Sequence, residues 1–590
     1  MNAARQRAAI ICVALLAASA ARSGELPPYR SFVPAVAVKL SSLSDTVRLL
    51  NDGLSGIGVE TTASDCSRRI AEALMLPSLE GADMAKPVHG FLLAHDPPAA
   101  APEPAVILPV RTNGAKDLLR SLQTRYSFVE GGNIKICTGP SEDKFVEPLY
   151  VAIAEGNAMI SPDIEAIRWM AYNLQSRTVP EIPAFRSAPV LASVNCPVLC
   201  GLLELMGPAA PVSPTQKDVA ATTLPDLGEA RSFLSSFSHI DLALGASIKQ
   251  LDVAARLTPR GSAMSSAFRT LPSPAEKLSA YFPPFACNNA ASAFPGFMAA
   301  LPQGVREWLA ELADNTRLVG FQILPAAFDL DERIRPFTSG ISLSSFIVDK
   351  PGGRIGAVSI YALKSPEKAD AALRGYFAGN GDGAGNRRIH NSTWKRDGKV
   401  IVYDLGGRDM DKSSAGGGTA GASLSQLFDL NHVELAVRDD LLIVARGSAR
   451  LMDHWLDEKP ASSWGVGISS LTGIFPPQTG ETVLGGGSVE PVFLARKIVE
   501  AAPGTSYLAP KMPHAGNGFA WRMSRKDGDV IFDVRLYSNE ILAINTLRDL
   551  DSSTLQELLS QLVLRNFHLS TEGETRYDVI RGRLRQFGGK

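Results

Sequence analysis

Short segments in which apolar and polar residues alternate recur along the chain, and helical periodicity follows many of them. Residues 149–160 and 433–444 each contain two alternating segments separated by an acidic break, Glu155-Gly156 or Asp439-Asp440. Alternation with a period of two is typical of a half-buried strand, so each region predicts a β-hairpin. The chain is therefore predicted to be α+β, with antiparallel sheets built from hairpins and covered on one face by amphipathic helices.

Four of these patterns occur twice and in the same order, which favours an internal duplication. The pairs are a strand and helix (106–120 and 358–374), the hairpins (149–160 and 433–444), a strand and short core helix (194–205 and 488–500), and a strand (248–257 and 525–536). In the last pair, one predicted strand face carries apolar residues in both copies, namely Leu251, Val253, Ala255 and Leu257 aligned with Val530, Phe532, Val534 and Leu536. Asn113 and Ser365 precede the paired helices, and both residue types are good helix N-caps.

The duplication predicts a division of the chain into five parts. A strand–helix unit at 24–84 precedes a first α+β repeat half at 85–335 and a second at 336–567. A signal peptide at 1–23 and a basic, poorly ordered tail at 568–590 complete the chain. Within 553–563 the spacing predicts a capped helix, and Gly/Pro/Ser-rich stretches at 207–225, 379–386 and 413–423 predict surface loops.

The N-terminus has the features of an export signal. Arg5 and Arg7 are followed by an apolar run at 8–18 and by the small residues Ala18-Ser19-Ala20. A run this short does not span a bilayer core, which requires about 20 residues. Another apolar stretch, 188–212, contains four prolines and Glu204, and is predicted to be a buried strand followed by a short core helix. The sequence thus predicts an exported protein, periplasmic or extracellular, that is not an integral membrane protein after signal cleavage.

Charge and cysteine content narrow the function further. With 59 Lys and Arg against 60 Asp and Glu, the chain has no basic excess for nucleic acid. Five scattered cysteines outside the signal peptide do not form a disulfide framework. Cys196 and Cys200 are four residues apart, so a helix would place them on one face, as a redox pair, half a metal site or, as we favour, two small buried residues.

Linear motifs of catalysis are missing from the sequence. No GxxxxGK[ST], HExxH, GxSxG or EF-hand pattern occurs. The SxxK patterns at Ser365–Lys368 and Ser141–Lys144 lack their companion motifs, and a helix cap accounts for Ser365. His89 and His95 would lie about 20 Å apart on a strand, too far to share a metal. His454 and Glu458 fit an exposed helix face better than a zinc site.

The two halves share apolar patterning and not reactive residues, which favours binding over catalysis. No catalytic, cofactor-binding or metal-binding residue is assigned, and no cofactor is expected. We expect an exported, non-catalytic binding or scaffold protein of the cell envelope that holds a hydrophobic ligand or a protein partner between its duplicated halves. The alternative is an exported hydrolase acting on cell-envelope material, with residues that converge from both halves.

Overall fold

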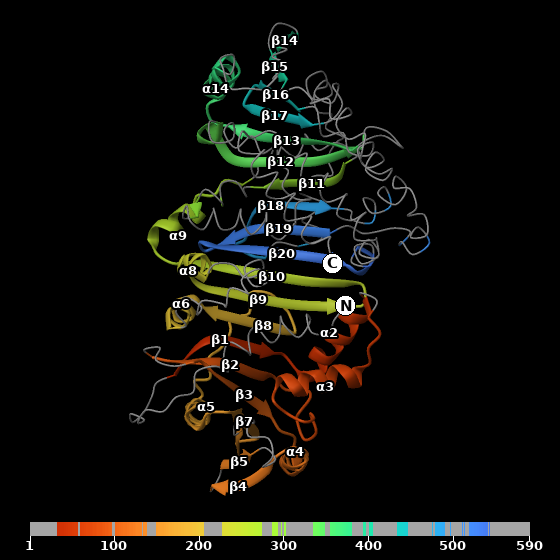
Figure 1. The fold of residues 1–590 in the computed structure, drawn as a ribbon, viewed down its shortest axis with the longest axis vertical. Coiled ribbons are helices and arrows are strands. Elements are labelled where there is room, and N and C mark those ends of the chain that lie inside the picture. Colours follow the sequence, from red (N-terminus) through yellow and green to blue (C-terminus); the bar gives the residue numbers. More distant parts are fainter. Residues whose placement is uncertain are drawn as a thin grey trace, which may run out of the picture. The chain divides into compact units, whose positions relative to one another are not determined.

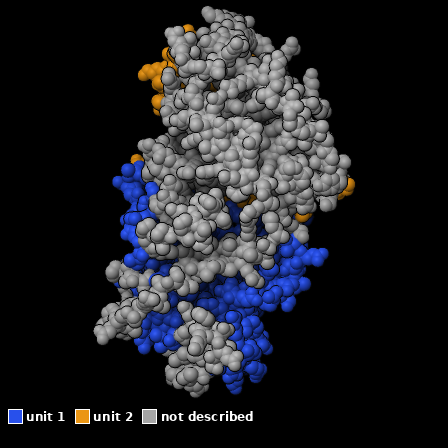
Figure 2. All heavy atoms as spheres, viewed as in Figure 1, with its two compact units in different colours: residues 1–265 blue, residues 266–590 orange. Residues whose placement is uncertain are grey.

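The protein is described from a computed structural model. The structure describes residues 32–56, 59–96, 101–131, 134–138, 149–205, 227–273, 286–292, 334–348, 355–379, 393–396, 400–404, 433–446, 478–489 and 519–540, with single residues or pairs at 297, 300–301, 475, 492, 496, 510, 513 and 542. It contains two compact units, Met1–Ser265 (unit 1) and Ser266–Lys590 (unit 2), which have separate colours in Figure 2. Each unit is considered by itself.

Unit 1 contains an antiparallel sheet (Figure 1). Successive pairings give the strand order β4-β5-β6-β7-β3-β2-β1-β8-β9-β10. The strands are β1 (Phe32–Leu40), β2 (Val88–His95), β3 (Glu103–Pro109), β4 (Ser127–Gly131), β5 (Ile134–Thr138), β6 (Leu149–Ala154), β7 (Asn157–Ser161), β8 (Val190–Asn195), β9 (Phe237–Ser247) and β10 (Gln250–Pro259). The β6/β7 hairpin predicted from alternation is confirmed, and its turn residues Glu155 and Gly156 have positive φ.

Helices cover both faces of this sheet, whereas one covered face was expected. On one face, α2 (Leu43–Gly56), α3 (Ala63–Ala73) and α4 (Gly114–Gln123) share a hydrophobic cluster with Val106 of β3. Val106 pairs with Gly90, so the next residue of β2, Phe91, points to the opposite face. There Phe91 contacts Trp169 of α5 (Ile164–Ser176), with ring centroids 5.4 Å apart.

Further helices lie on β1, β8 and β9. α6 (Cys196–Leu205) contacts these three strands and α8 (Leu227–Ser235), which itself contacts β9. The strand followed by a short core helix that was predicted within 188–212 is thus confirmed as β8 and α6. The continuous apolar run at the end of β3 is buried on both sides, as is typical of a strand with helices on both faces.

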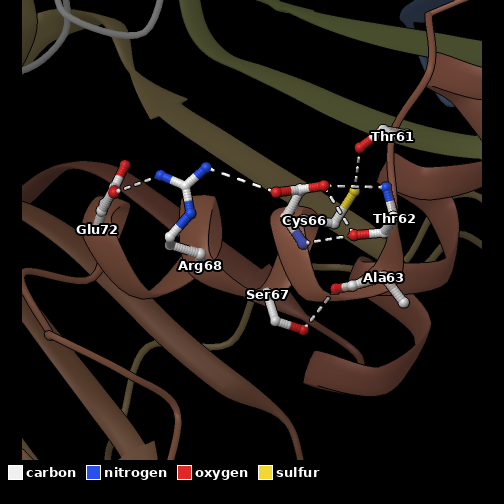
Figure 3. A network of polar contacts seen from close by, with 8 residues as sticks. Thr61, Thr62, Ala63, Cys66, Ser67, Arg68 and Glu72 are labelled. Carbon is white, nitrogen blue, oxygen red and sulfur yellow. Dashed lines mark hydrogen bonds and ion pairs between the residues drawn. The ribbon is translucent and has the colours of Figure 1, made fainter.

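The helix α3 begins with a capping box, shown in Figure 3. The Thr62 hydroxyl accepts a hydrogen bond from the Asp65 backbone N–H at 3.1 Å, and the Asp65 carboxylate accepts one from the Thr62 backbone N–H at 3.3 Å. Hydrogen bonds from Thr62 lower the pKa of Asp65, with a smaller contribution from Arg68. The cap satisfies N–H groups that the helix leaves without partners, and it fixes where α3 begins on the cluster.

The predicted cap at Asn113 is wrong in its geometry. Asn113 does occupy the N-cap position of α4, but its φ is 67° and its side chain makes no capping hydrogen bond. The cause is a close backbone approach: a Cβ at Gly81 or Gly114 would collide with the carbonyl oxygen of the other. The chain reaches this approach through a left-handed residue, a conformation that Asn tolerates better than most residues.

Unit 2 also contains an antiparallel sheet, with the order β14-β15-β16-β17-β13-β12-β11-β18-β19-β20. The strands are β11 (Ala286–Ser292), β12 (Thr338–Val348), β13 (Ile355–Leu363), β14 (Thr393–Arg396), β15 (Val400–Asp404), β16 (Val433–Arg438), β17 (Leu441–Arg446), β18 (Thr482–Val489), β19 (Phe519–Lys526) and β20 (Asp529–Tyr537). Among the described residues, the helices are α14 (Pro366–Gly379) and α9 (Ser262–Arg269), which begins in unit 1 and ends in unit 2, with the 3-10 turn η2 (Arg335–Phe337) before β12. The predicted β16/β17 hairpin is confirmed.

The two units have the same strand order. Adding ten to each strand number of unit 1 reproduces the order of unit 2, and the helix after β3 (α4) has a counterpart after β13 (α14). β1 pairs with both β2 and β8, so the strand expected in a separate unit at 24–84 belongs to the sheet of unit 1. Along the chain, the compact units divide at 265/266. The predicted domain limits at 84/85 and 335/336 stay predictions.

Several predicted segments lie outside the described residues. They are the signal peptide at 1–23, the loops at 207–225 and 413–423 and most of that at 379–386, the helix at 553–563 and the tail at 568–590. The pairs His454/Glu458 and Ser141/Lys144 lie outside them as well.

Candidate functional site

Where their register is regular, one face of the strands β1, β8, β9 and β10 carries apolar side chains only. The pairings Val38–Ala192, Ala192–Leu242 and Leu242–Ala255 fix this register across the four strands. Because residues alternate between faces along each strand, the register assigns fourteen residues to this surface, which we call the apolar face. They are Val36, Val38, Leu40, Val190, Ala192, Val194, Ile240, Leu242, Leu244, Ala246, Leu251, Val253, Ala255 and Leu257.

The apolar face is less buried than the opposite face of the same strands. Leu242, at its centre, is 40% exposed; twelve of the others are half-buried, and only Leu257 is buried. On the opposite face, Asp241 and Ala243, the neighbours of Leu242 on β9, are only 2% and 3% exposed. Apolar residues are normally the most buried ones. In these strands the apolar face is partly exposed, whereas Asp241 and Ala243 on the opposite face are buried, so the usual relation between hydrophobicity and burial is reversed here.

The apolar face continues a surface that helices cover elsewhere in unit 1. Leu40 packs against the hydrophobic cluster of α2, α3 and α4, so the cluster and the apolar face adjoin on one side of the sheet. Of these helices, α2 also contacts β9 and β10, and its Gly53 lies close to Ala246. The helical layer therefore reaches the apolar face from one side.

Part of the corresponding face of unit 2 is covered by aromatic side chains. On β20, Phe532 contacts Phe297, with ring centroids 5.5 Å apart, and Phe297 contacts Phe268 of α9 at 5.4 Å. Met523 and Val530 on this face are fully buried, whereas their counterparts by strand register, Leu244 and Leu251 of unit 1, are half-buried.

Behind the apolar face, the opposite side of the strands contains an ion pair. Asp241 of β9 accepts hydrogen bonds from Nε and Nη2 of Arg256 of β10, at 2.8 and 2.5 Å. The Arg256 guanidinium lies 5.1 Å from the ring centroid of Phe185, a cation–π contact. This arrangement satisfies a buried carboxylate and links the β9/β10 hairpin to the segment before β8.

Unit 2 repeats the arginine–phenylalanine contact. Arg535 occupies the strand position that corresponds to Arg256, and it lies 5.3 Å from the ring centroid of Phe475, which precedes β18. Arg522 stacks on the same ring at 5.7 Å and binds Asp533 at 2.5 Å and Glu481 at 3.2 Å. These ion pairs are almost completely buried.

The two candidate cysteines are placed on α6, and both are free and buried. Burial, with smaller contributions from Cys200 and Asp241, raises the pKa of Cys196 to about 12. Burial also raises the pKa of Cys200, whose thiol donates to the Arg231 carbonyl at 3.7 Å. A raised pKa suppresses the thiolate that redox chemistry and metal binding require, which agrees with the structural interpretation of this pair.

The two candidate histidines on β2 are also separate. His89 is half-buried, and burial, followed by the charge of Lys39, lowers its pKa. His95 is buried and contacts Phe32, with ring centroids 4.6 Å apart. Within the part of the chain that the structure describes, no group of three or more His, Cys, Asp or Glu is placed to hold a metal ion.

Sequence reasoning found only part of the apolar face. It placed the four residues of β10, Leu251, Val253, Ala255 and Leu257, on one strand face, and the register confirms this. The sequence patterns did not identify the other ten residues, although Ile240, Leu242 and Leu244 show the same alternation.

None of the helices in the described part of the chain has the length and hydrophobicity needed to cross a membrane.

Comparisons with known proteins do not assign the chain to a family. No protein-family model matches it, and no curated protein matches it. Among solved structures, it is similar to a chain titled "Structure of crystal form I of TP0453", with 11% identity and a TM-score of 0.21 over 38% of this chain and 74% of that one. A similarity this low carries no argument about fold or function.

Proposed function

We propose that the protein is a non-catalytic binding protein of the cell envelope that holds a hydrophobic small molecule on the apolar face of unit 1. The observation that supports this proposal is the partial exposure of thirteen of the fourteen contiguous apolar residues around Leu242. Surface of this kind costs about 25 cal/mol per Å² in water, so covering it is favourable. This proposal places the ligand within one unit.

A small molecule fits this face better than a protein partner does. Only Leu242 among the fourteen residues is more than about a third exposed. A stable protein interface covers about 800 Å² on each partner. The apolar face also offers no polar side chain to pair with polar groups of a ligand, which favours an acyl or other hydrocarbon chain.

We also propose that the two units arose by duplication. The shared strand order and the equivalent Arg256–Phe185 and Arg535–Phe475 contacts support this origin. An exported location is proposed from the N-terminal sequence alone, with Arg5, Arg7 and the following apolar run as its support. N-terminal sequencing of the secreted chain tests it, with a start near residue 24 expected.

The binding proposal is tested with a neutral hydrophobic dye. N-phenyl-1-naphthylamine fluoresces when it leaves water, and it carries no charge that would direct it to basic surfaces. We expect saturable binding to the wild-type chain and at least tenfold weaker binding to Leu242→Glu, because a carboxylate at the centre of the face must remain hydrated. The matched control is His239→Glu, an exposed position on the opposite face of the same strand.

The possible outcomes separate the alternatives. Equal dye affinity in wild type and Leu242→Glu would overturn the proposal. A concentration-dependent dimer that Leu242→Glu abolishes, without dye binding, would replace the small molecule by a second copy of the chain. Circular dichroism of both variants checks that the substitutions leave the fold intact.

A further inference from the structure

Unit 2 contains a hollow with a basic lining where β18 begins and the β19/β20 hairpin turns. Its volume is about 390 Å³. The lining includes the cationic side chains of Arg269, Arg525 and Lys526 and a single carboxylate, Asp527. Among the described residues, the side chains of Arg269 and Lys526 have no ion-pair partner. Three cations against one anion give the hollow a positive potential.

The chain holds one of these cations in place. Nη1 of Arg525 donates to the carbonyl oxygens of Arg269 and, at 2.8 Å, Leu271. These bonds orient the guanidinium plane, and the bonds made within the described residues use no other nitrogen of the group. A pre-oriented guanidinium loses little side-chain entropy when it binds an anion with its remaining N–H groups.

The hairpin turn and Thr482 complete the lining of the hollow. Asp527 and Gly528 both have positive φ, at 55° and 96°. Two such residues form the tight turn that matches a twisted hairpin. Thr482, at the start of β18, adds a hydroxyl to the lining. The hollow therefore combines cations with a neutral hydrogen-bonding group, as sites for oxyanions do.

The fold itself does not require these cations. In unit 1, the β9/β10 hairpin has the same strand pairing, and its residues at the positions of Arg525 and Lys526 are Ala246 and Ser247. The equivalent turn is Ile248-Lys249. A hairpin with the same register thus forms without the arginine and the lysine, so the basic lining is a property of unit 2.

We infer that this hollow binds a phosphate group, either as free phosphate or as part of a lipid headgroup. The net charge of the lining, three positive and one negative, suits a dianion or a phosphodiester anion. Arginine matches the geometry of phosphate oxygens, and lysine binds phosphate as a point charge. The inference stands on the residues of unit 2 and is independent of the apolar face.

The test compares two double variants of the full chain. Arg269→Ala/Lys526→Ala removes two cations of the hollow and keeps Arg525, which holds the chain before residue 272 in place. Lys249→Ala/Arg260→Ala removes two exposed cations of unit 1 and so has the same net charge. Binding of inorganic phosphate to each protein is measured by isothermal titration calorimetry at low salt. Binding to phosphatidylglycerol and to phosphatidylcholine vesicles is measured by cosedimentation.

We expect saturable phosphate binding by wild type and control, and at least tenfold weaker binding by the hollow variant. Preference for phosphatidylglycerol that only the hollow variant loses, without binding of free phosphate, would support the inference and identify the source as a lipid headgroup. Binding of neither probe would overturn the inference. Equal binding by the hollow variant and the control would overturn it as well, since the charge effect would then be non-specific.

Discussion

The two units differ in how far the apolar faces of their equivalent strands are covered by other side chains. Their terminal strands, β8–β10 and β18–β20, have the same order and carry apolar residues at most of the matching positions. In unit 2, Phe297 packs on Phe532 and itself contacts Phe268, and Met523 and Val530 are fully buried. In unit 1 the equivalent Leu244 and Leu251 are half-buried, and Leu242 is exposed. One sheet architecture thus supports apolar faces that are covered to different extents.

An apolar strand pattern does not by itself show which side chains, if any, cover that face of the sheet. Unit 1 folds with a partly exposed apolar face because other contacts stabilise it, such as the hydrophobic cluster around α2, α3 and α4. The accessible face is then available for a ligand.

The largest effect is expected for Arg522→Ala in unit 2. The substitution leaves Asp533 and Glu481 buried without the guanidinium, which costs about 3–5 kcal/mol. Arg256→Ala in unit 1 should cost about 2 kcal/mol, because 20% of its side chain is exposed and water can partly replace it. Urea denaturation measures both. Equal losses of stability would show that the two ion pairs are equally desolvated and would contradict the expected difference between the units.

A slightly smaller effect, about 3 kcal/mol, is expected for Phe297→Ala. The truncation leaves a cavity between Phe268 and Phe532. It should also give unit 2 an accessible apolar face and hence a second binding site for N-phenyl-1-naphthylamine. Fluorescence titration measures the number of sites. Phe297→Leu, which keeps most of the cover, is the control; unchanged dye binding in Phe297→Ala would contradict the role given to this ring.

A loss of about 1 kcal/mol is expected for Thr62→Ala, which removes the capping box of α3. Thr62→Ser retains the hydroxyl and should restore stability. Because α3 lies on the covered part of the sheet, neither substitution should change dye affinity. Reduced affinity in Thr62→Ala at a temperature where the chain is folded would show that the apolar face depends on the helical layer.

The smallest effect is expected from His89, whose pKa is lowered by burial. Between this lowered pKa and the ordinary value of 6.5, the unfolded chain binds more protons than the native one. Stability should therefore fall as the pH drops below about 6.5 and be unaffected by His89 above it. Urea midpoints at pH 7.5 and 5.5 measure this, and His89→Gln should show a smaller decrease. An equal decrease in both proteins would assign the effect to other groups.

Local periodicity predicted much of the fold but little of the candidate site. Alternation was sufficient for the β6/β7 and β16/β17 hairpins, because their turns are short and acidic. The continuous apolar residues from Ala105 to Val110 already indicated burial on both faces, although one covered face was expected. The left-handed Asn113 lies next to the close approach of Gly114 to Gly81, a contact between residues far apart in the sequence that leaves no local signal.

The apolar face could not be predicted because exposure depends on tertiary packing. The sequence around Leu242 alternates as in any half-buried strand, and the same pattern in β20 is covered by Phe297. Only the register across four strands shows that the apolar residues adjoin, and only the helix positions show that they remain accessible.

Native mass spectrometry tests the central proposal most directly. The wild-type chain, His239→Glu and Leu242→Glu are each incubated with hexadecan-1-ol, a neutral long-chain alcohol, and desalted under non-denaturing conditions. We expect a one-to-one adduct on wild type and His239→Glu and none on Leu242→Glu. An adduct on all three proteins, or on none of them, would contradict a hydrophobic ligand site on the apolar face.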